Sequence, residues 1–220
     1  LKYSAQTEDI GLHQPGSRPA PAREFRLPAR MHESELELAQ YVVEKLGRTH
    51  FVFCRPGRFT GLGYIAGWSA DQFVRVAEQP EQVAAEQLHA AEGLRASLEP
   101  FVDLGVDGAA IGEDYGFNSG PFVSPAAFGR IYAPAMARMC RIVHDFGLPC
   151  LFHSCGNNRQ ILDQMVAAGM DAYQAIQPVE RIDQLKALYG QRLTLWGGVS
   201  TDTLRRGTPE QVQQQALYTL

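Results

Sequence analysis

The sequence predicts an α/β fold of parallel strands joined by helices, and three observations carry this prediction. After Pro149, apolar strands and helical segments alternate at intervals of about 20 residues, as in repeated βα units. The strands are almost continuously apolar, which is typical of parallel strands buried on both faces. Polar residues follow the strand ends, where parallel barrels carry their chemistry. Five strands are predicted, which indicates a (β/α)8 barrel whose N-terminal strands and last strand lie outside this chain.

The first half of the chain is predicted in two parts. Residues 1–30 are rich in proline and predict loop or extended structure, and residues 31–220 are assigned to the barrel domain. Apolar spacing predicts a helix over 33–46, a short strand follows at 50–54, and a glycine-rich loop covers 57–68. Ser69 is expected to cap a short helix, and Pro80 to open a long helix that ends near Leu104.

The middle of the chain predicts a strand, a long helix and a second strand. Small residues at 106–111 form the first strand. Ser124 before Pro125 is typical of a helix start, with serine as the N-cap and proline in the first turn. This helix runs to residue 146, with a kink at Pro134, and a strand follows at 148–152.

The last part of the chain continues the same alternation. Helices are expected at 157–168 and 179–189, and strands at 170–176 and 192–196, with Trp196 in the core. Thr208, followed by proline and a glutamine at the third helical position, begins a final helix with a capping box.

Composition narrows the class of protein. The formal net charge of −4 supplies no basic field for nucleic acid or for an anionic membrane. No apolar run approaches the roughly 18–20 residues of a membrane span. The four cysteines match no disulfide framework, which predicts reduced thiols and a cytoplasmic protein. Because the chain starts at Leu1 and ends within a predicted helix, we expect a fragment of a longer protein.

The segment "LFHSCGNN" (151–158) places two soft metal ligands at the end of a strand. Leu151, His153 and Cys155 alternate along the strand and therefore share one face. Imidazole nitrogen and thiolate sulfur are preferred zinc ligands, but a zinc site needs three or four. The alternative is a strand-end histidine bonded to the backbone beside a buried cysteine. Cys54, at the end of an earlier strand, is a candidate third ligand.

Other strand ends carry further candidate residues. Glu113 and Asp114 are either a general acid or base that contacts substrate or part of a solvated turn. Gln177 either binds substrate or satisfies the backbone before Pro178. Gly197 and Gly198 either let a ligand approach the backbone or form a tight turn.

Four segments together resemble the uroporphyrinogen decarboxylase superfamily over roughly residues 60–220. They are "GEDYGFNSGPFVSPAAFGRIYAP", "HDFGLPCLFHSCGN", "GMDAYQAIQP" and "YGQRLTLWGGVSTDTLRRGTPEQV". Within that superfamily the "HSCG" stretch is more similar to the cobalamin-dependent methyltransferases than to the decarboxylases. The resemblance implies a (β/α)8 barrel.

The resemblance also implies a function. His153 and Cys155 would hold a zinc ion that activates a thiol, and the thiol would accept a methyl group from a corrinoid carried by a partner protein. The family's further cysteine ligand would follow the last strand, beyond this chain, so weak or empty zinc occupancy is expected. The alternatives are uroporphyrinogen decarboxylation and a non-catalytic ligand-binding barrel. Exposed strand edges would allow a homodimer.

Overall fold

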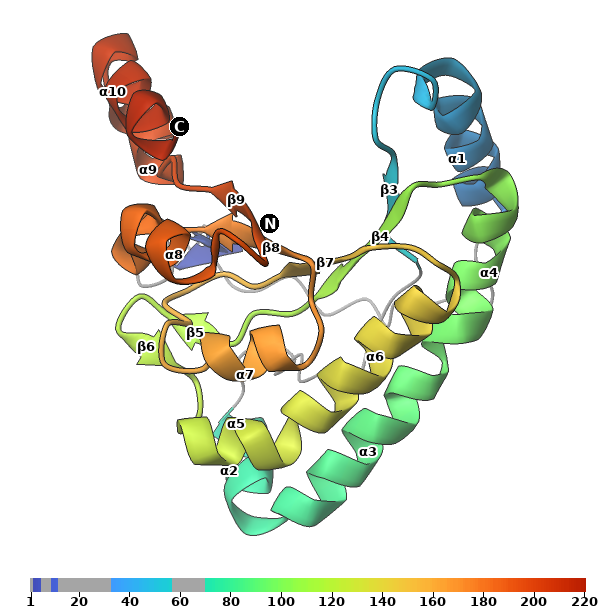
Figure 1. Cartoon of the computed structure of the whole chain (residues 1–220). Coiled ribbons are helices and arrows are strands. Elements are labelled where there is room, and N and C mark those ends of the chain that lie inside the picture. Colours follow the sequence, from blue (N-terminus) through green and yellow to red (C-terminus); the bar gives the residue numbers. More distant parts are fainter. Residues whose placement is uncertain (1, 5–8, 12–32, 57–69) are drawn as a thin grey trace, which may run out of the picture.

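A five-stranded parallel sheet forms the centre of the protein, and its strands lie in the order of the chain (Figure 1). The computed structural model describes residues 2–4, 9–11, 33–56 and 70–220. The strands are β3 (Phe53–Cys54), β4 (Gly108–Gly112), β7 (Cys150–His153), β8 (Ala172–Ile176) and β9 (Thr194–Gly197). Parallel neighbours in chain order require helical crossovers, so the α/β fold is confirmed.

The sheet is strongly curved. Four strand spacings of about 4.8 Å would separate the edge strands by about 19 Å in a flat sheet. Instead, the ring centroids of Phe53 on β3 and Trp196 on β9 lie 6.4 Å apart. Side chains from the two edges therefore converge, as they do inside a barrel. Within the described ranges the sheet is an arc and does not close.

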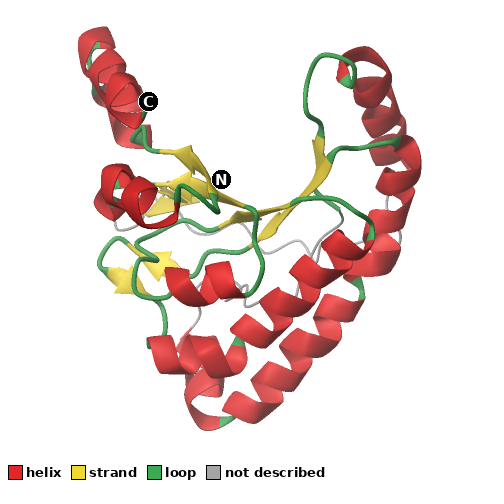
Figure 2. Cartoon of the chain, in the orientation of Figure 1, coloured by secondary structure: helices red, strands yellow, loops and turns green. Residues whose placement is uncertain are grey.

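Helices cover the convex face of the sheet (Figure 2). The helices of the described ranges are α1 (Glu33–Leu46), α2 (Ala70–Glu78), α3 (Pro80–Glu92), α4 (Leu94–Leu104), α5 (Pro125–Ile131), α6 (Ala133–Asp145), α7 (Leu162–Ala167), η2 (Pro178–Glu180), α8 (Ile182–Tyr189), α9 (Thr201–Arg206) and α10 (Pro209–Thr219), and the last two lie beyond the β9 edge instead of on that face (Figure 1). The central crossover helices α3 and α6 pack on each other beneath β4 and β7, whereas α1 and α10 lie toward the two rims.

Three helices predicted as continuous are each broken in two. The predicted 179–189 helix consists of η2 and α8, separated by Arg181 at a φ of 57°. The predicted 80–104 helix ends at Glu92, and the Gly93 N–H bonds to Ala90 O before α4 begins. The helix predicted to kink at Pro134 breaks at Tyr132 instead. Pro134 lies in the first turn of α6, where its missing N–H leaves no helical hydrogen bond unmade.

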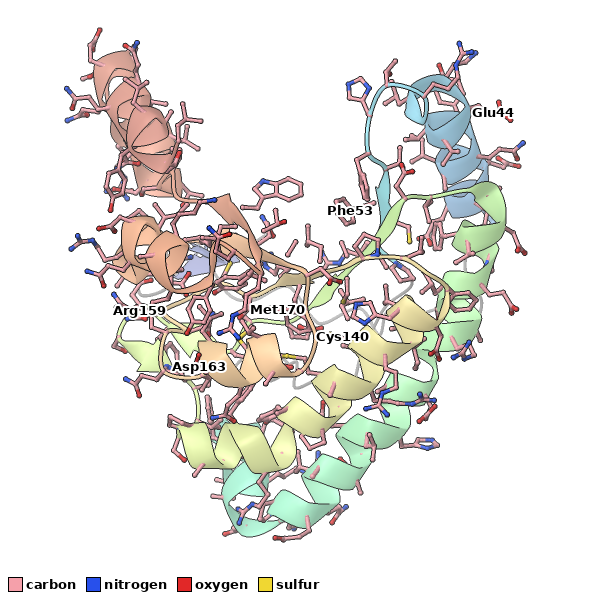
Figure 3. The ribbon with its side chains drawn as sticks, viewed as in Figure 1. Glu44, Phe53, Cys140, Arg159, Asp163 and Met170 are labelled. Atoms are coloured by element: carbon pink, nitrogen blue, oxygen red, sulfur yellow. The ribbon has the colours of Figure 1, made fainter. Side chains whose placement is uncertain are left out.

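The hydrophobic core lies between the sheet and the helices. Alternate strand residues such as Ala109, Phe152 and Tyr173 are buried there, together with the inward faces of α5 and α6. Trp196 was expected in this core, but its side chain is 53% exposed. It pairs in register with Gln174 and therefore lies on the concave face. Figure 3 shows Phe53 on that open side, and Cys140 and Met170 on the helix side.

Two small antiparallel pairs accompany the main sheet. β1 (Lys2–Ser4) pairs with β2 (Asp9–Gly11), and β5 (Gly116–Phe117) with β6 (Gly120–Pro121). The rest of the predicted proline-rich segment, the 57–68 loop and Ser69 lie outside the described residues. None of the helices among the described residues combines the length and apolarity needed to cross a membrane.

Candidate metal centre

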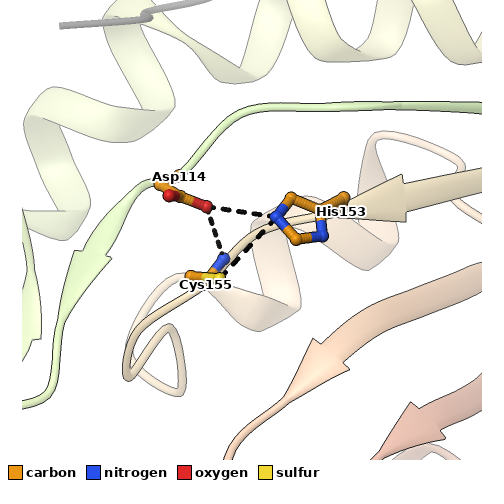
Figure 4. A group of neighbouring side chains, drawn as sticks. All are labelled: Asp114, His153 and Cys155. Atoms are coloured by element: carbon orange, nitrogen blue, oxygen red, sulfur yellow. Dashed lines mark hydrogen bonds and ion pairs between the residues drawn. The ribbon is translucent and has the colours of Figure 1, made fainter. Parts of the chain in front are cut away.

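Three side chains from two neighbouring strands meet at the carboxyl end of the sheet (Figure 4). Asp114 follows β4, His153 ends β7, and Cys155 follows β7 by two residues. The register pairs Gly112 with His153, which brings the two strand ends side by side. His153 Nε2 lies 3.7 Å from Cys155 Sγ and 3.4 Å from Asp114 Oδ1. The side chains of His153 and Cys155 therefore lie side by side, although β7 ends at His153 and Cys155 belongs to the loop that follows it.

The spacing of these donors fits a metal ion. Tetrahedral zinc with ordinary bond lengths separates nitrogen from sulfur by about 3.6 Å and nitrogen from oxygen by about 3.3 Å. One ligand atom from each of the three residues lies within 4.8 Å of the other two, and the described part of the chain contains no second group of this kind. Asp114 and His153 are each 32% exposed, so small molecules can reach the group. These residues could hold a metal ion.

Gln174 fixes the orientation of the histidine ring. Its Oε1 faces His153 Nδ1, and because an amide oxygen only accepts, Nδ1 donates this bond. The neutral ring then presents the lone pair of Nε2 to Asp114 and Cys155, which is the usual arrangement of a metal-binding histidine. Gln174 was not among the site residues predicted from the sequence. Its signal was a lone polar residue within an otherwise apolar parallel strand.

Asp114 and His153 shift each other's pKa, and each shift favours the charged form. Burial alone would raise the pKa of Asp114, but His153 and the Cys155 backbone N–H, which donates to Oδ1 at 2.7 Å, bring that pKa below its usual range. Burial alone would lower the pKa of His153, but Asp114 and Gln174 raise it. Asp114 is therefore a carboxylate at neutral pH, as a metal ligand must be.

Glu113 is the second carboxyl group at this strand end. Burial, and then the charge of Asp114, raise the pKa of Glu113 to about 7, against the opposing effects of Arg55 and His153. A solvated turn was the alternative prediction for Glu113 and Asp114. Both groups instead lie partly buried beside His153, which suits proton transfer at neutral pH.

The other predicted site residues contribute to chain packing. Gln177 is the N-cap residue of η2; its backbone N–H donates to Glu180 Oε2 at 3.2 Å, and its backbone carbonyl accepts from the Glu180 N–H at 2.9 Å. A Cβ on Gly197 would lie 2.6 Å from Ile176 N, and one on Gly198 would lie 2.3 Å from Thr219 Cγ2. Their contact with a substrate remains a prediction. Cys54 is buried in the core and lies outside the Asp114 group, so its candidacy as a third ligand was wrong.

The carboxyl group of Glu180, in η2, is buried against the loop that carries Cys155. Its Oε1 accepts from Tyr173 OH at 2.9 Å and from the Asn158 N–H at 3.1 Å, and its Oε2 accepts from the Gln177 N–H at 3.2 Å. Burial raises the pKa of Glu180 from 4.5 to about 7, although these donors and the charge of Arg159 oppose the rise.

The raised pKa of Glu180 predicts a pH dependence of stability. The folded state holds this proton more tightly than the unfolded state, so the contribution is fully present below pH 4.5 and is lost as the pH rises toward 7. The free energy of unfolding, relative to that of Glu180→Gln, should fall by up to about 3 kcal/mol across this range. Urea unfolding of both proteins at several pH values measures this difference. A difference that grows with pH would show instead that the hydrogen-bond donors dominate.

The fold of this chain matches a solved structure, and its sequence matches a known protein family. The fold matches a methyltransferase from Methanosarcina mazei with a TM-score of 0.68 and 18% sequence identity, over 84% of this chain and 53% of that chain. The chain thus spans about half the length of the matched structure. No curated protein sequence matches it. The sequence model of the family described as uroporphyrinogen decarboxylase matches residues 36–220, and the chain belongs to this family.

Proposed function

We propose that this chain is the metal-binding part of a zinc-dependent methyltransferase that moves a methyl group between a corrinoid protein and a thiol or similar acceptor. The observation that carries the proposal is the donor set of Asp114, His153 and Cys155, whose ligand atoms lie within 4.8 Å of one another. An imidazole, a thiolate and a carboxylate suit zinc, and three protein ligands leave the fourth position for a substrate.

Each residue of the site has a proposed task. His153, oriented by Gln174, would bind through Nε2, Cys155 through Sγ and Asp114 through a carboxylate oxygen. When bound, zinc would lower the pKa of a thiol and stabilise its anion. Glu113, half-buried beside Asp114, is the proposed acceptor of the thiol proton. A cytoplasmic location is part of this proposal, since the four cysteines are free thiols.

The proposed reaction balances without a further reagent. The corrinoid would supply a methyl group bound to cobalt. A carbon–sulfur bond to the thiol would form as the carbon–cobalt bond breaks, with the electron pair of that bond left on the corrinoid. Glu113 or water would accept the thiol proton. The corrinoid would be brought by a partner protein and would approach from the concave face of the sheet, on which His153 lies in register with Gln174 and Trp196.

The second candidate function is decarboxylation of a polycarboxylated tetrapyrrole, which the description of the family favours. Such a substrate needs basic groups for its carboxylates. Arg55, at the end of β3 and close enough to act on the pKa of Glu113, is one such group among the described residues. This reading needs no zinc, so metal content separates the two. A non-catalytic ligand-binding barrel is the third reading.

The test uses the zinc-loaded chain with methylcobalamin and a small thiol. We expect the absorbance of methylcobalamin to decay and the S-methyl product to appear in mass spectra, with both signals lost in His153→Ala. Zinc binding without methyl transfer to any thiol would favour the binding reading. Release of carbon dioxide from a polycarboxylated tetrapyrrole by the metal-free chain would favour the decarboxylase.

A further inference from the structure

A buried polar network lies directly beneath the loop that carries Cys155. Ser154, Asn158 and Glu180 are fully buried polar residues, and Tyr173 is a fully buried aromatic residue whose hydroxyl joins them. Burying so many polar groups is unfavourable unless they bond to one another. None of these residues is a candidate metal ligand, so metal binding by them does not account for the network.

Asn158 contacts the ligand loop directly. Its Nδ2 lies 3.0 Å from Cys155 O, 3.0 Å from Ser154 Oγ and 2.9 Å from Tyr173 OH. The amide therefore holds the backbone of the residue that carries the thiol. The loop also needs Gly156 at a φ of 91°, because a Cβ there would lie 2.1 Å from Gly116 O.

Glu180, in the turn after β8, holds the backbone of Asn158 in place. Its carboxyl accepts from the backbone N–H of Asn158 and of Gln177, which joins the loop after β7 to the turn after β8. Ser154 Oγ in turn accepts from the Tyr115 N–H at 3.0 Å, beside Asp114. One network thus fixes the segments that carry two of the three candidate ligands.

We propose that Asn158, anchored by Glu180, is a positioning residue that places Cys155 for metal binding. This role rests on the proposed function, which supplies the zinc site, and it names the residues that set the position of the thiol ligand. A thiol reaches a metal through a single side-chain torsion, so its position follows the Cys155 backbone. Groups of this kind, one step behind the ligands, change metal affinity by about 10–100-fold when removed.

The test compares Asn158→Ala and Glu180→Gln with Asp171→Asn in the full chain. Asp171 Oδ2 accepts from the Cys150 N–H at 2.7 Å and lies 2.8 Å from His144 Nε2, at the opposite end of β7. This control disturbs the same strand without touching the ligand loop. Zinc affinity is measured by competition with a chelator, and the sulfur-to-cobalt charge-transfer band is recorded after Co²⁺ loading.

We expect Asn158→Ala to weaken zinc binding about 10–100-fold and to shift the cobalt band, Glu180→Gln to do the same to a smaller extent, and Asp171→Asn to change neither. Equal affinity in the wild type and Asn158→Ala, or an equal loss in Asp171→Asn, would overturn the inference.

A second readout needs no metal. In the metal-free wild type, Cys155 is only 7% exposed and should react slowly with iodoacetamide. Site-resolved mass spectrometry should show faster alkylation of Cys155 in Asn158→Ala and an unchanged rate in Asp171→Asn, at a temperature where all variants are folded. If the wild type binds no zinc, the proposed function fails by itself. Unchanged alkylation in Asn158→Ala rejects the positioning role whether or not zinc binds.

Discussion

Replacing Cys155 with alanine is expected to abolish zinc binding. Asp114 offers the third donor that the family resemblance placed beyond this chain, so the wild type should hold about one zinc ion per chain instead of the weak or empty occupancy expected from the sequence. The variant would keep only two ligands, below the three of catalytic sites. The thiolate is also the softest donor of the group. Elemental analysis of purified, chelator-washed protein measures the effect, and the proposed methyl transfer should be lost with the metal.

Two variants control for this result. His153→Ala removes the central ligand and should also abolish zinc binding. Cys150→Ala removes a thiol from the same strand, but Cys150 is buried on the helix side, with its Sγ 3.6 Å from Cys140 Sγ. It should retain full zinc. Full zinc in Cys155→Ala would reject the ligand assignment.

Replacing Gly112 with alanine should strongly destabilise the fold. Gly112 has a φ of 142°, and a Cβ there would lie 2.1 Å from His153 O and 2.6 Å from His153 N. The side chain would have to push β4 away from β7 at the point where Asp114 and His153 meet. We expect the free energy of unfolding to fall by at least about 3 kcal/mol, together with loss of zinc.

Gly147→Ala separates backbone strain from this clash. Gly147 also has a positive φ, 75°, but a Cβ there would meet nothing within 4 Å. Its replacement should cost only about 1–2 kcal/mol, the strain of a left-handed residue. Chemical denaturation of both variants gives the comparison. An equal decrease in the free energy of unfolding in both variants would show that the close approach of β4 and β7 at Gly112 does not contribute to the effect.

The alternation of strands and helices made most of the fold predictable. All five predicted strands are present in one parallel sheet, because continuous apolar runs between helix caps are a local signal. The points at which a predicted helix divides into two were less predictable. Pro134 signalled a disturbance, but only the packing of α5 and α6 separates a kink from a new helix start. The exposure of Trp196 could not be predicted, since it depends on which face of a curved sheet is covered.

The candidate site was partly predictable. The spacing of His153 and Cys155 predicted a shared face because side chains alternate along a strand. The approach of Asp114 to His153 depends on the pairing of β4 with β7, which follows from the sheet order and not from any local motif. Gln174 reaches His153 for the same reason, across the pairing of β7 with β8.

X-ray absorption at the zinc edge of the zinc-loaded chain tests the proposed metal site most directly. The account predicts one sulfur neighbour at about 2.3 Å and two or three nitrogen or oxygen neighbours at about 2.0 Å. In Cys155→Ala loaded with excess zinc, the sulfur signal should vanish. A wild-type spectrum without sulfur, or with two or more sulfur neighbours, would contradict a site built from Asp114, His153 and Cys155.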